Sequence, residues 1–369
     1  MSKELSHGEV LELNAMRAAI AEVWPTRADC RAVERKLAAV STTDLLTLSY
    51  DEVNQLIPQG EKKLTSSSLR ALQEAIHWCR IDVCVMGRTP VVFSAPHTLV
   101  LQRDGEPDHK VEESTATLAR DFARSCGGGF VTWKEAERER VRSLRGPCPT
   151  NRDPNYLHDG ELRGSAWLAA LRQLREQLAP SGGVVTRPCL HVDVHGIRNP
   201  PTHPADLLVG TDAMRRHLGD SRTDALCARI EAELRPVLRK LPVPTSMTPV
   251  AAPAAASDAG GSVGNSSSSA DSDHDASGAC MELHVGGPST PAPALGGDWG
   301  AGSERSTLTQ LSTDSSLWLK CASDGSPPSS CFTHALQLEM SLRLRRHLAA
   351  HRTDREAFAA ALVAIARGI

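Results

Sequence analysis

Short apolar runs that end at Pro or Gly alternate with amphipathic segments from about residue 90 onward. The runs at 90–97, 130–133 and 190–194 have the length and composition of strands that are buried on both faces. Segments 112–123 and 162–178 carry apolar side chains at helical spacing, and Gly or Pro follows each of them. This alternation predicts an α/β fold in which helices flank a mostly parallel or mixed sheet.

The chain has 369 residues, enough for one large domain or two smaller ones. Residues 1–85 show helical spacing and no catalytic constellation, which predicts a helical N-terminal extension before an α/β domain over 86–369. Gly, Ser, Ala and Pro occupy 33 of the 50 positions from 251 to 300. Such a segment buries too little apolar surface to order itself, so about 245–305 is predicted to be a disordered insertion within the domain.

Charge and hydropathy argue against several classes of function. Lys and Arg number 41 and Asp and Glu number 44, so a formal net charge of −3 argues against a protein that binds nucleic acid through bulk charge. No apolar run reaches the ~18 residues of a membrane span, and the first residues lack the apolar core of a secretory signal. The ten cysteines include no CxxC pair, which is typical of reduced thiols. We therefore expect a cytoplasmic protein that binds neither nucleic acid nor membrane.

The segment from His191 to Gly196 places polar side chains on one face of a predicted strand. Alternate residues of a strand share a face, so His191, Asp193 and His195 line one face and the intervening valines line the other. Three buried polar side chains are costly unless they bond to one another or coordinate a metal. Both interpretations stay open. In the second, one histidine is a ligand and Asp193 orients a ring, that of His191 or His195.

His97 directly follows the first apolar run. Ligands in open α/β sheets bind at the carboxyl ends of strands, so His97 either binds a metal there or is a hydrogen-bonded loop histidine. Glu112 and Glu113 open the next predicted helix, where the helix dipole alone also favours acids. With His97 and His195, one of these carboxylates would complete a zinc site with an open position, the catalytic pattern. Asp104 is the fallback carboxylate.

Two further polar segments carry candidate substrate-binding or catalytic residues. Asn151 and Arg152 lie in a polar loop, and the guanidinium fork of Arg152 suits a substrate carboxylate, with a surface salt bridge as the alternative. Glu339 shares a face with Gln337 on a predicted strand whose other residues are apolar. We expect Glu339 at the end of this strand, near the two histidines, unless it pairs with Arg343.

The candidate motifs follow one another in this order: Ser94-Ala-Pro-His97, Glu112-x-x-Thr115-x-x-Leu118-Ala119, Asn151-Arg152-Asp153-Pro154, Asp193-x-His195-Gly196, Asp206-Leu207-x-x-Gly210-Thr211 and Gln337-x-Glu339. The ordered set resembles the N-formylglutamate amidohydrolase family and, more distantly, zinc carboxypeptidases and poly-γ-glutamate hydrolases. The resemblance spans about 90–245 and 315–350. It implies a zinc-exopeptidase-like α/β fold with one zinc ion per chain, which hydrolyses an amide or peptide-like bond next to a carboxylate.

Carried over residue by residue, the resemblance implies that His97, Glu112 and His195 are the metal ligands. It implies that Asn151 and Arg152 hold the substrate carboxylate and that Glu339 is the general base. The implied substrate is a small acidic N-acyl amino acid or an acidic peptide. In carboxypeptidases the first two ligands form a His-x-x-Glu motif, whereas in this chain 14 residues separate His97 from Glu112. Glu113 therefore remains the alternative ligand.

Two other functions fit the same sequence. The fold could be a catalytically inactive hydrolase that binds a protein partner, because neither the helical residues 1–85 nor the Ser-rich insertion is needed for chemistry. It could also be a zinc carboxypeptidase that acts on protein tails. We favour the active amidohydrolase because every expected ligand and base position carries a suitable side chain.

Overall fold

The computed structural model describes residues 16–142, 151–242 and 281–369, with shorter gaps that include 104–106, 179–187, 198–204, 286–304 and 315–330. The helices are α2 (Arg27–Lys36), α4 (Tyr50–Leu56), α5 (Ser66–Arg80), α6 (Thr115–Cys126), α7 (Glu135–Arg142), α9 (Ala166–Leu178), α10 (Asp212–Leu218), α11 (Asp220–Lys240), α12 (Leu308–Thr313), α14 (Leu342–Ala350) and α15 (Arg352–Arg367). None of the described helices is long and apolar enough to cross a membrane.

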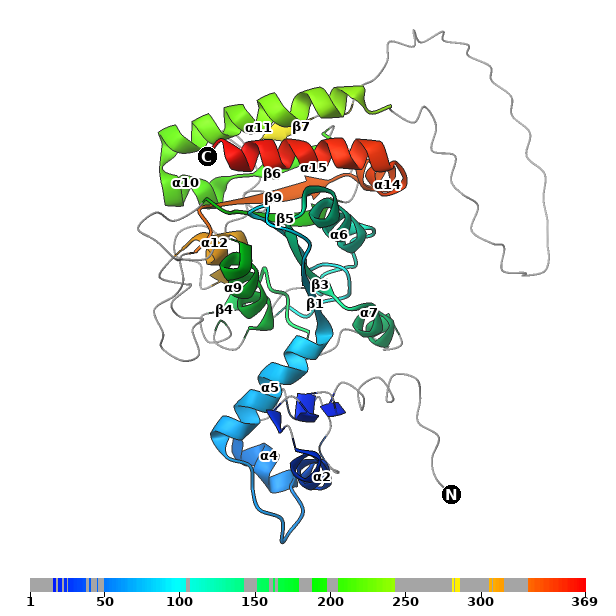
Figure 1. The fold of residues 1–369 in the computed structure, drawn as a ribbon, viewed down its shortest axis with the longest axis vertical. Helices are drawn as coiled ribbons and strands as arrows, with labels where there is room; N and C mark the ends of the chain where they lie inside the picture. Colours follow the sequence, from blue (N-terminus) through cyan, green and yellow to red (C-terminus); the bar gives the residue numbers. More distant parts are fainter. Residues whose placement is uncertain are drawn as a thin grey trace, which may run out of the picture.

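A mixed seven-stranded sheet forms the centre of the molecule (Figure 1). Its strands, in spatial order, are β1 (Ile81–Val85), β3 (Gly129–Trp133), β2 (Val91–Ala95), β5 (Leu190–Gly196), β9 (His334–Met340), β6 (Leu207–Gly210) and β7 (Leu283–Val285). β3, β2, β5 and β9 are parallel neighbours, whereas β1 and β6 run antiparallel to β3 and β9. β4 (Leu157–His158) and β8 (Arg305–Ser306) form a separate antiparallel pair. The predicted α/β class with a mixed sheet is confirmed.

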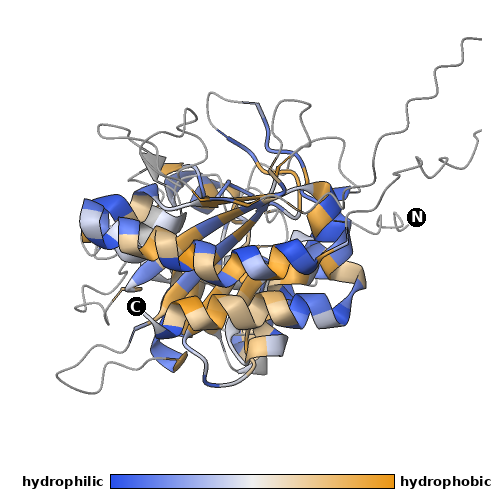
Figure 2. Ribbon diagram, turned by 90° about the horizontal axis from the view of Figure 1, so that it is seen from above, coloured by the Kyte–Doolittle hydropathy of each residue, from blue (hydrophilic) through white to orange (hydrophobic). Residues whose placement is uncertain are grey.

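Helices cover both faces of the sheet, and each layer has its own apolar cluster. On one face α6, α11 and α15 pack together, and the valines of β5 point into this layer as predicted. On the other face α9 and α12 contact the sheet, with Trp167 and Leu171 in the apolar cluster. The strands are largely apolar in Figure 2, and the helices have both apolar and polar sides, as helices that cover a sheet require. The polar residues of β5 therefore stand on the α9–α12 side.

The N-terminal helices form a third apolar cluster of their own, which includes Leu45, Val53, Leu72 and Ile76. Helix α5 leads directly into β1, and in Figure 1 the other N-terminal helices lie beside α5, away from the sheet. Residues 81–85 pair with β3, so the sheet begins within the segment 1–85 for which the sequence predicts helices. The short run Ile-Asp-Val-Cys-Val follows a helix without a Gly or Pro break, so its strand character was hidden.

Part of the predicted insertion also belongs to the sheet. Leu283–Val285 pairs with β6 and packs on the core, although the sequence places it within the segment 245–305. A few apolar residues next to a long segment rich in Gly, Ser, Ala and Pro are too weak a pattern to reveal a strand of three residues. Residues 243–280 and 286–304 lie outside the described residues, so the rest of this prediction is not tested.

Candidate metal centre

Two histidines meet because their strands are parallel neighbours. β2 pairs with β5, with Val92 opposite His191 and Ser94 opposite Asp193. The carboxyl ends of both strands therefore reach the same edge of the sheet, where His97 follows β2 and His195 stands one residue before the end of β5. Both side chains are buried. This is the place that the sequence predicts for a ligand site.

A left-handed residue brings Glu112 to the histidines. The Glu112 N–H donates to the His97 carbonyl oxygen at 2.7 Å, and Ser114 has a φ of 68°, which turns the chain before α6 begins at Thr115. The sequence predicts Glu112 in the first turn of a helix, but Glu112 lies in the loop before α6. Glu113 points away and pairs with Arg346 at the surface. Glu112 thus lies with the histidines, and the fallback Asp104 lies outside the described residues.

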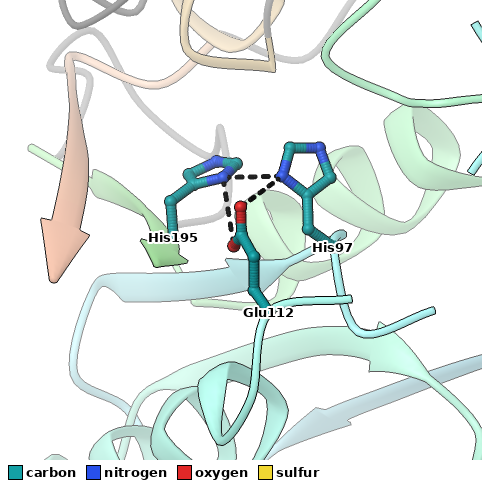
Figure 3. Close-up of side chains that lie close together, drawn as sticks. All are labelled: His97, Glu112 and His195. Atoms are coloured by element: carbon teal, nitrogen blue, oxygen red, sulfur yellow. Dashed lines mark hydrogen bonds and ion pairs between the residues drawn. The ribbon is translucent and has the colours of Figure 1, made fainter. Parts of the chain in front are cut away.

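The three side chains come together at one point (Figure 3). The His97 Nδ1 is 3.0 Å from Glu112 Oε1 and 2.9 Å from the His195 Nδ1. The His195 Nδ1 lies 3.6 Å from Glu112 Oε2, which also accepts a hydrogen bond from the Gly196 N–H at 2.9 Å. A side chain at position 196 would displace the Arg345 guanidinium, because a Cβ there would lie 2.3 Å from the guanidinium carbon.

The other ring nitrogens indicate why a cation fits here. The His97 Nε2 lies 3.0 Å from Asp153 Oδ1, and the His195 Nε2 lies 2.6 Å from Asp193 Oδ2. An ionised carboxylate only accepts, so each Nε2–H donates, and a neutral ring then keeps a lone pair on Nδ1. Two Nδ1 lone pairs and the Glu112 carboxylate thus converge with no donor among them. This pattern, with carboxylates that orient histidine ligands, fits zinc and similar ions.

Charges around the cluster shift the titration of its members. Burial opposes the charged form of His97, but Asp153 and Glu112 outweigh it and raise the His97 pKa to about 9. Asp193 and Glu112 likewise overcome burial and hold the His195 pKa well above its ordinary value. Burial disfavours ionised Glu112, yet the two histidines lower its pKa far below the ordinary range. The carboxylates around the two rings thus favour positive charge at this point.

The polar loop after residue 150 serves the site through residues other than those predicted. Asp153 bonds to His97 and also accepts from the Arg103 Nε at 2.6 Å, and Asn155 donates to Asp193 Oδ2 at 2.9 Å. The Asn151 side chain instead bonds to residues outside the candidate centre. Its amide donates to Glu137 at 2.8 Å and accepts from Arg80 at 3.3 Å.

Arg152 is half-buried, and its backbone pairs with Gln102 in an isolated bridge. The sequence motif therefore lies in the loop whose Asp153 and Asn155 contact the two histidines. The direction in which each side chain points follows from the loop conformation, which a motif of this length does not encode.

Glu339 lies beside His195, as the sequence predicts. The two residues are opposite one another across the parallel pair β5–β9, so their side chains share a face of the sheet. Gln337 donates to Glu339 Oε1 at 2.7 Å, and Arg343 bonds to Asp206 rather than to Glu339. Burial raises the pKa of the Glu339 carboxyl, although the charge of His195 opposes the shift. A carboxyl with a raised pKa is suited to general acid–base catalysis.

Two further histidines lie near the centre. His191 bonds to the hydroxyls of Ser94 and Ser312, and burial lowers its pKa to about 4, so it is a hydrogen-bonded core residue. His109 was missed by sequence analysis. Its ring stacks on His97 with a centroid separation of 3.6 Å, and burial together with the charge of His97 lowers its pKa to about 3. His109 stands alone in a loop, so no spacing signals it.

A pocket of about 230 Å³ adjoins Glu112. Residues 98–100, 111–114 and 116–117 form part of its wall, and α7 contributes Arg138, Val141 and Arg142. Arg138 and Arg142 both pair with Glu135, and the Arg138 Nε has no hydrogen-bond partner among the described residues. The two guanidinium groups thus share one carboxylate on α7, and the carboxylates of Glu112 and Glu113 line the same pocket.

Comparisons with known proteins establish no family for this chain. No protein-family profile matches it, and no curated protein matches it. A solved bacteriophage poly-γ-glutamate hydrolase is similar at a TM-score of 0.33 and 11% identity, over 78% of this chain and 89% of that one. A gene product of Agrobacterium tumefaciens is similar at a TM-score of 0.34 and 13% identity, over 78% and 94%. At these low TM-scores, the fold and the site define only an α/β protein with a candidate metal centre.

Proposed function

We propose that this chain is a metal-dependent hydrolase that cleaves an amide bond next to a carboxylate. The observation that carries the proposal is the convergence of His97 Nδ1, His195 Nδ1 and Glu112, with Asp153 and Asp193 fixing the two rings. Three protein ligands of this kind leave a coordination position open, which is typical of catalytic rather than structural zinc. A bound zinc ion would supply Lewis-acid polarisation of the scissile carbonyl and a water of lowered pKa.

Glu339 is the proposed general base. It is buried on the same face of the sheet as His195, and its raised pKa brings proton exchange closer to neutral pH. In this role Glu339 would take a proton from the attacking water and later give it to the leaving nitrogen. Gln337 holds the carboxylate in place through its hydrogen bond to Oε1.

The pocket beside Glu112 supports an acidic substrate, such as an N-acyl amino acid or an acidic peptide. We place the substrate carboxylate against Arg138 and Arg142, because the Asn151 amide already bonds to Glu137 and Arg80. A guanidinium is suited to this role since it binds carboxylates through two parallel hydrogen bonds. The half-buried Arg152 remains the residue that the sequence predicts for it.

Turnover of N-acyl glutamates and short acidic peptides by the zinc-loaded protein tests the function. Glu339→Gln should retain its metal and lose about 10²- to 10⁴-fold in kcat, because only proton transfer is removed. His195→Ala should lose the activity and the ion held by His97, Glu112 and His195. A Glu339→Gln variant that works at the wild-type rate, or a wild-type protein that holds metal and hydrolyses none of these amides, would overturn the proposal.

The arginines of the pocket can be separated from Arg152 by kinetics. Arg142→Ala and Arg138→Ala should each raise KM for acidic substrates by about tenfold, since a charge-assisted hydrogen bond to a carboxylate contributes about 1.5 kcal/mol, while kcat changes little. Arg152→Ala is the matched control. If KM rises in Arg152→Ala alone, the substrate carboxylate binds in the loop of Arg152, as the sequence predicts, and not at α7.

A further inference from the structure

A second group of metal-ligating side chains lies where α14 meets α15, apart from the site above. His347 is on α14, His351 joins the two helices, and Asp354 is in the first turn of α15. One ligand atom from each of the three lies within 4.8 Å of the other two. His351 follows the last residue of α14, and its backbone N–H donates to the His347 carbonyl oxygen at 2.9 Å, so the end of the helix brings the two rings together.

Hydrogen bonds leave the ring of His351 ready to bind a cation. Its Nδ1 lies 2.9 Å from the His347 carbonyl oxygen, which can only accept, so Nδ1 carries the proton and the lone pair of a neutral ring is on Nε2. A backbone carbonyl that fixes the tautomer in this way is the usual partner of a histidine ligand. The two rings stack with their centroids 4.1 Å apart and their planes 17° from parallel.

The other two side chains are held together at the same place. The His347 Nε2 lies 2.7 Å from Asp354 Oδ2, and His347 is buried while His351 is exposed. The neighbouring arginines have other partners. Arg355 donates to the carbonyls of Leu348 and Ala349, and Arg352 donates to Glu356. Asp354 therefore faces the two histidines without a guanidinium between them.

We propose that His347, His351 and Asp354 form a second site for a divalent transition-metal ion of the zinc class. Two imidazoles and one carboxylate are ligands that this class of ion prefers. The exposed ring of His351 leaves the site open to solvent, so the ion can exchange with the bulk. A bound ion would join the end of α14 to the start of α15 and stabilise this corner. The inference does not depend on the proposed hydrolase activity, because it shares no residue with the first site.

The test uses Zn²⁺ alone and Co²⁺ alone, added to the full chain with His195→Ala, in which the first site is disabled. After gel filtration, elemental mass spectrometry should find about one ion per chain, as expected for one three-ligand site. Adding His351→Ala should abolish this binding. Adding His217→Ala, which changes an exposed histidine of α10, should leave it intact. A Co²⁺ absorption spectrum that vanishes with His351 provides a second readout.

Thermal unfolding provides an independent arm in the otherwise wild-type chain. Saturating Zn²⁺ should raise Tm less in His351→Ala than in the wild type, because one of two stabilising ions is lost. His351 is exposed, so this substitution leaves the core packing intact. No Zn²⁺ on the His195→Ala chain, or equal Zn²⁺ with and without His351, would overturn the proposal and leave His347 and Asp354 as a hydrogen-bonded pair only.

Discussion

At the scale of single residues, the candidate centre depends on which atom of each ring faces inward. Asp153 and Asp193 each take the Nε2–H of one histidine, which leaves both Nδ1 atoms directed at Glu112. The two aspartates thus orient the histidine rings and do not belong to the group that could hold a metal ion. Arg103 and Asn155 extend this arrangement outward, because each donates to one of the two aspartates.

Asp153→Asn should lower the affinity for zinc by about 10- to 100-fold while the fold is kept, since partners of ligating histidines contribute this much. A competition titration against a zinc chelator measures the affinity, and circular dichroism checks the fold. Asp108→Asn, at an exposed position of the preceding loop, is the matched control. Unchanged affinity in Asp153→Asn would show that the orientation of the His97 ring does not matter.

The sequence indicates where the two histidines meet, but not which side chains bond to them. His97 and His195 are placed by strand ends and by the parallel order of the sheet, both of which follow from apolar patterning. Asn151 was assigned to substrate, yet its side chain bonds to Glu137 in an internal network. Which way a loop side chain points depends on tertiary packing, and so does the position of His109 over the ring of His97.

At the scale of elements, one strained residue before α6 separates the roles of two adjacent acids. Ser114 has a left-handed backbone, which costs a residue other than Gly about 1–2 kcal/mol, and α6 therefore begins three residues later than the sequence predicts. Glu112 consequently faces the histidines, whereas Glu113 reaches Arg346 on α14. Helical spacing predicts that α6 exists, but a left-handed residue that is not Gly leaves no signal of where it begins.

Replacing Ser114 tests this turn. Ser114→Val should destabilise the protein by about 1–2 kcal/mol, because a β-branched residue tolerates the left-handed region poorly, and it should also weaken zinc binding as Glu112 is displaced. Ser114→Gly should change the free energy of unfolding by about 0.5 kcal/mol or less, since the relief of strain offsets the added chain entropy. Urea unfolding and zinc titration measure both effects. Equal stability of the two variants would show that the left-handed conformation at Ser114 is not needed for this turn.

At the scale of the whole molecule, a buried ionic network joins the N-terminal helices to the α/β layer. Arg80 ends α5, Glu137 and Arg140 lie on α7, and Asn151 lies in the loop that orients His97; all four are buried. Glu137 accepts from Arg140 and Asn151 at 2.5 and 2.8 Å and lies 3.9 Å from Arg80. The loop that orients His97 and the N-terminal helices are thus linked through the Glu137 carboxylate.

Glu137→Gln should destabilise the protein by about 3–5 kcal/mol, because two buried guanidinium groups lose their counter-charge. Glu135→Gln on the exposed side of α7 should cost about 1 kcal/mol or less, as surface pairs do. Burial raises the pKa of Glu137, but Arg140 and Arg80 outweigh it and lower that pKa. Its stabilising contribution is therefore present above the ordinary glutamate pKa and is lost as the pH falls through the lowered value. Urea unfolding at neutral and acidic pH measures both effects.

The metal content of the purified protein tests most directly whether this edge of the sheet holds a metal ion. It is measured by elemental mass spectrometry on the wild type and on His195→Ala, after reconstitution with Zn²⁺. Convergence of His97, Glu112 and His195 predicts that the variant holds about one ion per chain fewer than the wild type. His217→Ala, at an exposed position of α10, should match the wild type. Equal zinc in the wild type and His195→Ala would contradict a metal centre at this edge of the sheet.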